Sequence, residues 1–201
     1  MSSFWIYVEI GLKHVLDSNA YDHILFLMAL SATHTFKEWK KLLLLITIFT
    51  IGHTFALVLS VYNVLNILES LVEFLIPITI LVTAVLNFVP NKKSKKKGSS
   101  AAVATLTLFF GLIHGLGFSN YFKAILPGNA SEKVKPLFEF SLGIEAAQLA
   151  VVLSILALSY IAQTIFKVSK RDFTIVVSAF IIGVVTPMII ENQFWTTFKW
   201  N

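Results

Sequence analysis

Residues 109–119 read FFGLIHGLGFS and place one histidine, His114, among phenylalanine, leucine, isoleucine and glycine. The role of that histidine depends on the medium that surrounds the stretch. The 201-residue chain is 56% hydrophobic and 13% charged, and its mean hydropathy is +0.78. Soluble domains carry roughly 25% charged residues, which cover their surfaces. The composition therefore predicts an integral membrane protein.

Apolar runs long enough to cross a bilayer core, which takes about 20 helical residues, recur along the chain. They predict six transmembrane helices, at residues 20–36, 41–62, 68–89, 101–119, 136–165 and 173–192. The lysine-rich segment 91–100, NKKSKKKGSS, is typical of a cytoplasmic linker between spans. The predicted fold class is an all-α integral membrane protein, with six helices in one bundle and residues 1–201 in a single transmembrane domain.

Basic residues are unevenly distributed between the two sides of this predicted bundle. The three connections on the side of the linker contain three, five and three of the 16 Lys and Arg residues, and the other side contains the rest. Because basic loops stay in the cytoplasm, both termini are expected on the extracytoplasmic side. His34 lies at the cytoplasmic interface and is expected to be solvated. The net charge of +5 follows from this bias and indicates no nucleic-acid partner.

Polar side chains inside the predicted spans gather at one depth. With a rise of about 1.5 Å per residue, His53 and His114 lie about 18 and 20 Å above the cytoplasmic ends of their spans. Glu145 lies about 13 Å below the outer end of its span. The outer ends of other spans contribute Asp22, His23 and Glu73. Polar groups at such depth are costly and mark functional sites, so this convergence is the strongest signal in the sequence.

Helical spacing adds supporting polar groups and explains the glycines around His114. Ser141, Glu145 and Gln148 are spaced i, i+4 and i+7, so they share one helix face. Gly111 and Gly115 form a pattern of small residues that lets a neighbouring helix approach closely. We expect that neighbour to be the span that contains Glu145.

Each of these residues also has a purely structural explanation. Asp22 can satisfy the first turn of its helix, and His14 can be an interfacial residue of an amphipathic segment. His53 and His114 can be neutral imidazoles that bond a backbone carbonyl between helices. The structural explanation is weakest for Glu145, because a lone buried carboxylate is expensive.

The available donor atoms restrict the metal that such a cluster would bind. The chain has no cysteine and only three methionines, so imidazole and carboxylate ligands point to Ni²⁺, Co²⁺ or Zn²⁺ and away from Cu⁺. A proton relay can use similar groups. The expected metal ligands are His14, Asp22, His23, His53, His114 and Glu145. The expected supporting residues are Gln148, Glu73 and Ser141.

Four stretches, in this order and spacing, resemble the HupE/UreJ family of bacterial membrane proteins. They are GLKHVLDSNAYDHILFLMAL (11–30), TIFTIGHTFAL (47–57), LFFGLIHGLGF (108–118) and FSLGIEAAQLAVV (140–152). The resemblance covers about residues 10–155. The positions similar to the family's motifs are His14, Asp22, His23, His53, His114, Glu145 and Gln148. It implies a six-span nickel or cobalt permease in the bacterial cytoplasmic (inner) membrane.

Two classes of function are compatible with these residues, and the resemblance favours the first. A divalent-metal transporter would bind its ion in the outer half of the bilayer and pass it along a polar path, for which Thr47, Thr50, Thr79 and Thr83 are candidates. An intramembrane zinc-type hydrolase would act on a lipid or a membrane-bound substrate, with Glu145 or Asp22 as base. The enzyme requires a closed floor and an opening to lipid. A metal sensor or accessory subunit is a third possibility. The expected partners are the metal ion and the lipid bilayer, and no protein partner is indicated.

Overall fold

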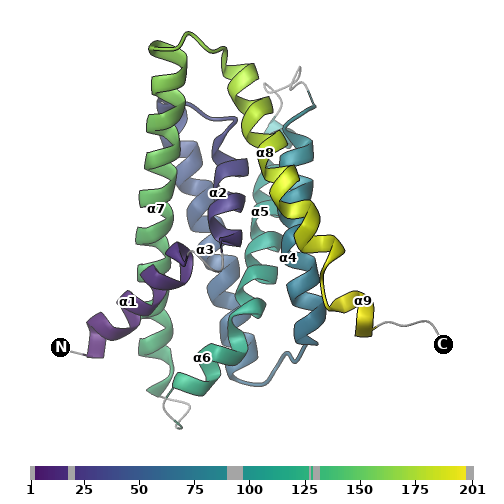
Figure 1. The fold of residues 1–201 in the computed structure, drawn as a ribbon. Helices are drawn as coiled ribbons and strands as arrows, with labels where there is room; N and C mark the ends of the chain where they lie inside the picture. Colours follow the sequence, from purple (N-terminus) through teal and green to yellow (C-terminus); the bar gives the residue numbers. More distant parts are fainter. Residues whose placement is uncertain (1–2, 18–20, 90–96, 127, 129–131, 198–201) are drawn as a thin grey trace.

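The computed structural model describes residues 3–17, 21–89, 97–126, 128 and 132–197, and these residues form helices and no strands (Figure 1). The all-α prediction is confirmed for this part of the chain. The helices are α1 (Ser3–Leu16), α2 (Asp22–Ser31), η1 (Phe36–Glu38), α3 (Trp39–Val61), α4 (Glu69–Leu86), α5 (Lys97–Gly117), α6 (Ser119–Ile125), α7 (Val134–Thr164), α8 (Lys170–Ile190) and α9 (Phe194–Thr197).

Several helices are long and apolar enough to cross a membrane. Within the described residues there are four such spans: Phe36–Val61, Glu69–Leu86, Val134–Thr164 and Lys170–Thr196. The pair α5 and α6 makes a fifth if it is counted as one span, broken by a bend of 52°. The membrane class is thus borne out, whereas the predicted count of six spans is not confirmed.

The difference in span number arises at residues 20–36, which were predicted to cross the bilayer. The helix there, α2, has only ten residues, or about 15 Å of length, against a hydrocarbon core of about 30 Å. It lies inside the bundle (Figure 1), and seven of its ten residues are buried. Hydropathy cannot distinguish apolar residues that face lipid from those that face protein, so the sixth span at residues 20–36 stays a prediction.

Glycines bring two pairs of helices into backbone contact. A Cβ atom on Gly11 of α1 would overlap the carbonyl oxygen of Phe140 of α7, and one on Gly143 would overlap that of Val8. Only glycine therefore allows α1 to lie directly against α7. This contact places the end of α1, and with it His14, against the bundle.

The glycines around His114 serve a different pair from the one expected. A Cβ atom on Gly111 would overlap the carbonyl oxygen of Phe49, and one on Gly115 would overlap that of His53. Both partners belong to α3, so the prediction that these glycines admit the helix of Glu145 is wrong. The close seam between α3 and α5 places His53 and His114 on neighbouring backbones.

The first and last described helices, α1 and α9, lie toward the same end of the bundle as α6 (lower end of Figure 1). An arrangement with both termini on one side is compatible with this. The side of the membrane on which they lie stays a prediction, as does the single-domain organisation. Residues 91–96 of the predicted cytoplasmic linker lie outside the described residues, and α5 begins at Lys97.

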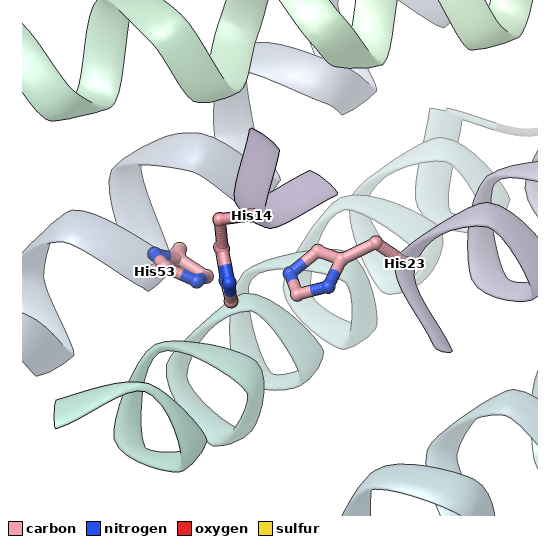
Figure 2. Close-up of side chains that lie close together, drawn as sticks. All are labelled: His14, His23 and His53. Carbon is pink, nitrogen blue, oxygen red and sulfur yellow. The ribbon is translucent and has the colours of Figure 1, made fainter. Parts of the chain in front are cut away.

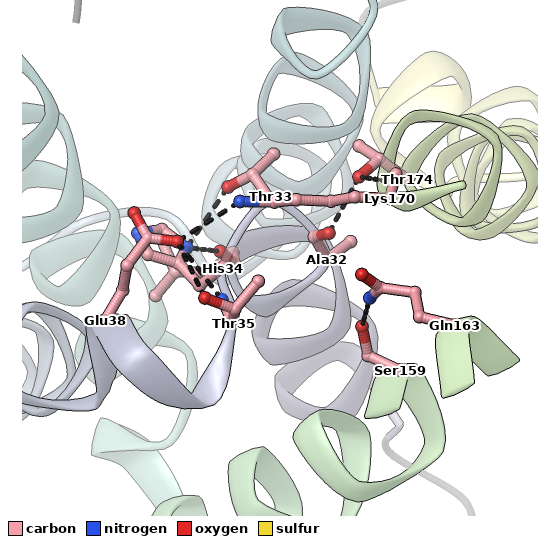
Figure 3. A network of polar contacts seen from close by, with 10 residues as sticks. Ala32, Thr33, His34, Thr35, Glu38, Ser159, Gln163, Lys170 and Thr174 are labelled. Atoms are coloured by element: carbon pink, nitrogen blue, oxygen red, sulfur yellow. Dashed lines mark hydrogen bonds and ion pairs between the residues drawn. The ribbon is translucent and has the colours of Figure 1, made fainter. Parts of the chain in front are cut away.

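The opposite end of the bundle is held by α8. Ser169 caps this helix and accepts a hydrogen bond from the backbone N–H of Asp172 at 3.0 Å. The first turns of α8 then reach two neighbouring elements (Figure 3): Lys170 Nζ donates to Glu38 Oε2 at 3.1 Å, and Thr174 Oγ1 donates to the carbonyl of Ala32 at 2.8 Å. These contacts tie α8 to η1 and to the end of α2.

His34 lies within this network and was expected to be solvated, which is wrong. Its side chain is only 6% exposed. The imidazole Nδ1 donates to the carbonyl of Leu30 at 3.0 Å and lies 3.1 Å from Thr33 Oγ1 (Figure 3). The turn between α2 and η1 folds inward because Thr35 and Glu38 cap each other at the start of η1.

Candidate metal centre

Three histidines from three helices converge in the half of the bundle that holds α1 and α6. His14 of α1, His23 of α2 and His53 of α3 direct their rings toward one point (Figure 2). Their ligand atoms all lie within 4.8 Å of one another. Two nitrogens bound to one ion at about 2.1 Å are at most about 4.2 Å apart, so small ring rotations would let the three bind a single ion.

His114 adds a fourth imidazole to this group. Its ring centroid lies 5.2 Å from that of His23. Nδ1 of His114 lies 2.8 Å from the carbonyl oxygen of Phe110, one turn earlier on α5. A carbonyl can only accept, so Nδ1 carries the proton and Nε2 keeps its lone pair for a ligand. The structural explanation, a bond between helices, does not apply, because this bond stays within α5.

The unpaired ring nitrogens are the strongest sign of a ligand. In the part of the chain that the structure describes, Nε2 of all four histidines and Nδ1 of His53 are buried without a hydrogen-bond partner. Leaving a buried polar atom unsatisfied costs about 1–3 kcal/mol, and native structures contain few such atoms. Five of them at one place are compatible with a ligand that nitrogen atoms coordinate.

Asp22 lies beside His23 of the cluster. Its Oδ1 is 3.3 Å from Nδ1 of His23. A carboxylate that accepts from Nδ1–H leaves Nε2 of the same ring to bind a metal, which is the usual arrangement of metal-bound histidine. Asp22 is also the first residue of α2, where the helix dipole stabilises a negative charge. In this geometry Asp22 orients His23.

Phenylalanine rings enclose the four histidines, and the sequence-based set did not include them. The ring of Phe118 lies 3.9 Å from that of His14, and the ring of Phe49 lies 5.2 Å from that of His114. The remaining rings near the cluster belong to Phe26 and Phe140. Such walls exclude water and hold the imidazoles in place. The spacing of Phe49 and His53, four residues apart on one helix, was the available signal.

Glu145 lies at another place. Its Oε1 accepts a hydrogen bond from Thr47 Oγ1 at 2.7 Å. Thr47 precedes His53 by six residues, or about 9 Å along α3. Gln148 is likewise beside Thr50, whose Oγ1 lies 2.9 Å from Gln148 Oε1. The structure therefore does not bring these two predicted residues to the histidines.

Two further predicted supporting residues are engaged with other groups, and one buried acid was missed. Glu73 is exposed on α4, and its backbone carbonyl accepts from Asn192. Ser141 donates to the carbonyl of Phe138 on its own helix at 2.8 Å. Glu139 is 2% exposed, and its Oε1 lies 3.7 Å from Nζ of Lys135. The i,i+4 spacing of that pair was the signal for it.

A helical protein with several candidate membrane spans and a buried group of histidine nitrogens has the features of a metal-handling integral membrane protein. The family model described as "HupE / UreJ protein" matches residues 1–193. The chain belongs to this family, as its motifs indicated. Membership implies a function related to nickel or cobalt transport, and the histidine cluster is compatible with it. Searches of curated proteins and of solved structures each found no match.

Proposed function

We propose that this protein carries a divalent transition-metal ion, nickel or cobalt, across the bacterial cytoplasmic membrane. The ion binds first to His14, His23, His53 and His114. The observation that carries this proposal is the set of unpaired, buried Nε2 atoms at one place. Neutral imidazoles suit Ni²⁺, Co²⁺ and Zn²⁺, whereas Mg²⁺ and Ca²⁺ prefer oxygen ligands.

The surroundings of the histidines support capture of an ion from water. The imidazoles replace the water ligands that the ion gives up, and the Asp22 carboxylate close to His23 offsets part of the positive charge. The rings of Phe118 and Phe49 keep other water away. The ligands come from four separate helices, α1, α2, α3 and α5, so a change in the packing of one helix alters the number of ligands and releases the ion.

An intramembrane zinc hydrolase is less well supported. It needs a base beside the metal and an opening through which a substrate in the membrane can enter. Of the two expected bases, Glu145 hydrogen-bonds Thr47 instead, and Asp22 is engaged with Nδ1 of His23. A groove of about 320 Å³ does open between α3, α4 and α5, but its lining is apolar, with Phe55, Ile113 and Leu116 among it and none of the four histidines. These features support transport over hydrolysis.

A comparison of two buried histidines tests the proposal. We expect purified protein to bind Ni²⁺ or Co²⁺ tightly in isothermal titration calorimetry and to carry it into proteoliposomes that contain a metal-sensitive dye. His53→Ala should lose both properties because it removes a ligand whose two ring nitrogens are free of other partners. His34→Ala, a matched change at the other end of the bundle, should keep both. Tight binding by His53→Ala, or its absence from the wild type, contradicts the proposal.

A further inference from the structure

We propose that Thr47, Thr50, Glu145 and Gln148 form a second cation site, separate from the histidines, that receives the ion on its way across the membrane. This inference rests on the proposed transport function. The four side chains come from α3 and α7. The site would hold a divalent cation that keeps part of its water, because the donors are a carboxylate, an amide and hydroxyls.

The pairing of these residues brings them to one level of the bundle. Thr47 contacts Glu145 at 2.7 Å, and Thr50 contacts Gln148 at 2.9 Å. The helices α3 and α7 run in opposite directions (Figure 1), so uncrossed pairs would join Thr47 to Gln148 instead. The observed pairs cross, so they overlap in height along the two helices. The two pairs therefore place oxygen donors from α3 and α7 at one level of the bundle.

Gln148 has a free polar atom in this cluster. Its side chain is fully buried, and Nε2 has no partner among the described residues. The single hydroxyl proton of Thr50 faces two acceptors, Gln148 Oε1 and the carbonyl of Ile46 at 3.2 Å. If the amide is turned, Thr50 donates to Ile46 and accepts from Nε2, and Oε1 becomes the unpaired atom. In that orientation each of the two hydrogen bonds of Thr50 has its own proton, and the amide oxygen of Gln148 is left for a cation.

Glu145 supplies the charge that a cation needs. The carboxylate is half-buried in the middle of α7, and no ion pair of the described residues involves it. Glu139, six residues earlier, differs because Lys135 lies close to it. An acid without a basic partner at this depth is expensive to keep unless it serves an ion or a proton.

The order of the two sites follows from their chemistry and position. Thr50 and Thr47 precede His53 by about 4.5 and 9 Å along α3, toward the end of the bundle that α8 closes. Imidazole ligands suit nickel and cobalt better than carboxylate, amide and hydroxyl oxygens do. A path of several sites conducts only if each releases its ion, so an oxygen site after a histidine site favours release.

The test separates binding from transport in the full-length protein. Glu145→Gln keeps the shape of the side chain and removes its charge. We expect Ni²⁺ binding in calorimetry to stay at the wild-type level, while Ni²⁺ uptake into dye-loaded proteoliposomes falls by about tenfold or more. Thr47→Val, which removes the hydroxyl partner and keeps the carboxylate, should also slow uptake with binding intact. Ser141→Ala, one turn away on α7 with a bond only to its own helix, should behave as the wild type.

Different results overturn different claims. Weaker Ni²⁺ binding by Glu145→Gln would make Glu145 part of the histidine site and end the idea of a second one. Wild-type uptake by both Glu145→Gln and Thr47→Val would show that the ion does not use these residues. A wild-type protein that binds no Ni²⁺ and carries none would instead overturn the proposed function, and the second site with it.

Discussion

The two ends of the bundle each bury histidine, and they bury it in opposite ways. At one end, His34 donates Nδ1–H to Leu30 and sits beside Thr33 in a network that joins α2, η1 and α8. At the other end, His53 has no partner for either ring nitrogen among the described residues. Both side chains are buried, since His34 is 6% exposed and His53 is 0% exposed. The difference lies in the unpaired ring nitrogens of His53, which are the reason we propose it as a ligand and His34 as a structural residue.

The largest expected effect breaks the packing that holds the histidine end together. A methyl group on Gly115 would meet the backbone of His53, and helix α5 would have to move. We expect Gly115→Ala to lose Ni²⁺ binding and to lower the free energy of unfolding by about 1–3 kcal/mol. Both are measured on purified protein, by calorimetry and by thermal unfolding.

Gly183 of α8 provides the control for that change. A Cβ atom there meets nothing within 4 Å. Gly183→Ala should therefore leave binding unchanged and keep or raise stability, by up to about 1 kcal/mol, since alanine is the better helix former. Equal behaviour of the two alanine variants would show that the α3–α5 seam does not position the site.

A smaller effect is expected when the carboxylate of Asp22, beside His23, loses its charge. Asp22→Asn keeps an oxygen near Nδ1 of His23 but weakens its hold on the ring. Changes of this kind reduce metal affinity about 10–100-fold, and we expect Ni²⁺ titration to show a loss in that range. Glu38→Gln removes the charge of the carboxylate that pairs with Lys170 at the other end of the bundle. This control should leave the Ni²⁺ affinity unaltered. An unaltered affinity in Asp22→Asn would mean that Asp22 only begins its helix.

The smallest effect concerns acid stability at the His34 end. Burial lowers the pKa of His34 below its usual 6.5, as do Lys41 and Lys170, although the Leu30 carbonyl and Glu38 act in the opposite sense. As the pH falls, the unfolded chain therefore binds a proton at His34 before the folded protein does. The stability that neutral His34 contributes is complete above pH 6.5 and declines as the pH falls below it. In metal-free protein, His34→Gln should lose less of its thermal stability between pH 7.5 and pH 5.5 (an interval of about two units around that value) than the wild type loses. Parallel losses would assign the acid sensitivity to other groups.

Those features of the fold and of the candidate site that depend on one helix alone could be predicted from the sequence. The membrane class follows from composition, and counting along apolar helices predicts that His53 and His114 lie close together. Both residues do lie in one cluster with His23. Here the rise of the helix is sufficient, because α3 and α5 are long and lie directly against each other.

Prediction failed where the answer depended on which helices touch. Gly111 and Gly115 predict a close neighbour but not its identity, and that neighbour is α3. The face shared by Glu145 and Gln148 was predicted from spacing, yet the residues opposite it are threonines, not histidines. His14 had an interfacial alternative because nothing in its own helix shows that Gly11 lets α1 lie against α7.

The short helix α2 also has a consequence for the order in which the protein is made. A helix of ten residues cannot be retained by lipid alone, and its neighbours include α4, α7 and α8. All three are synthesised after it, so α2 has no stable position until nearly the whole chain has left the ribosome. His23 takes its place only then, so the proposed ion site is completed as one of the last events of biogenesis.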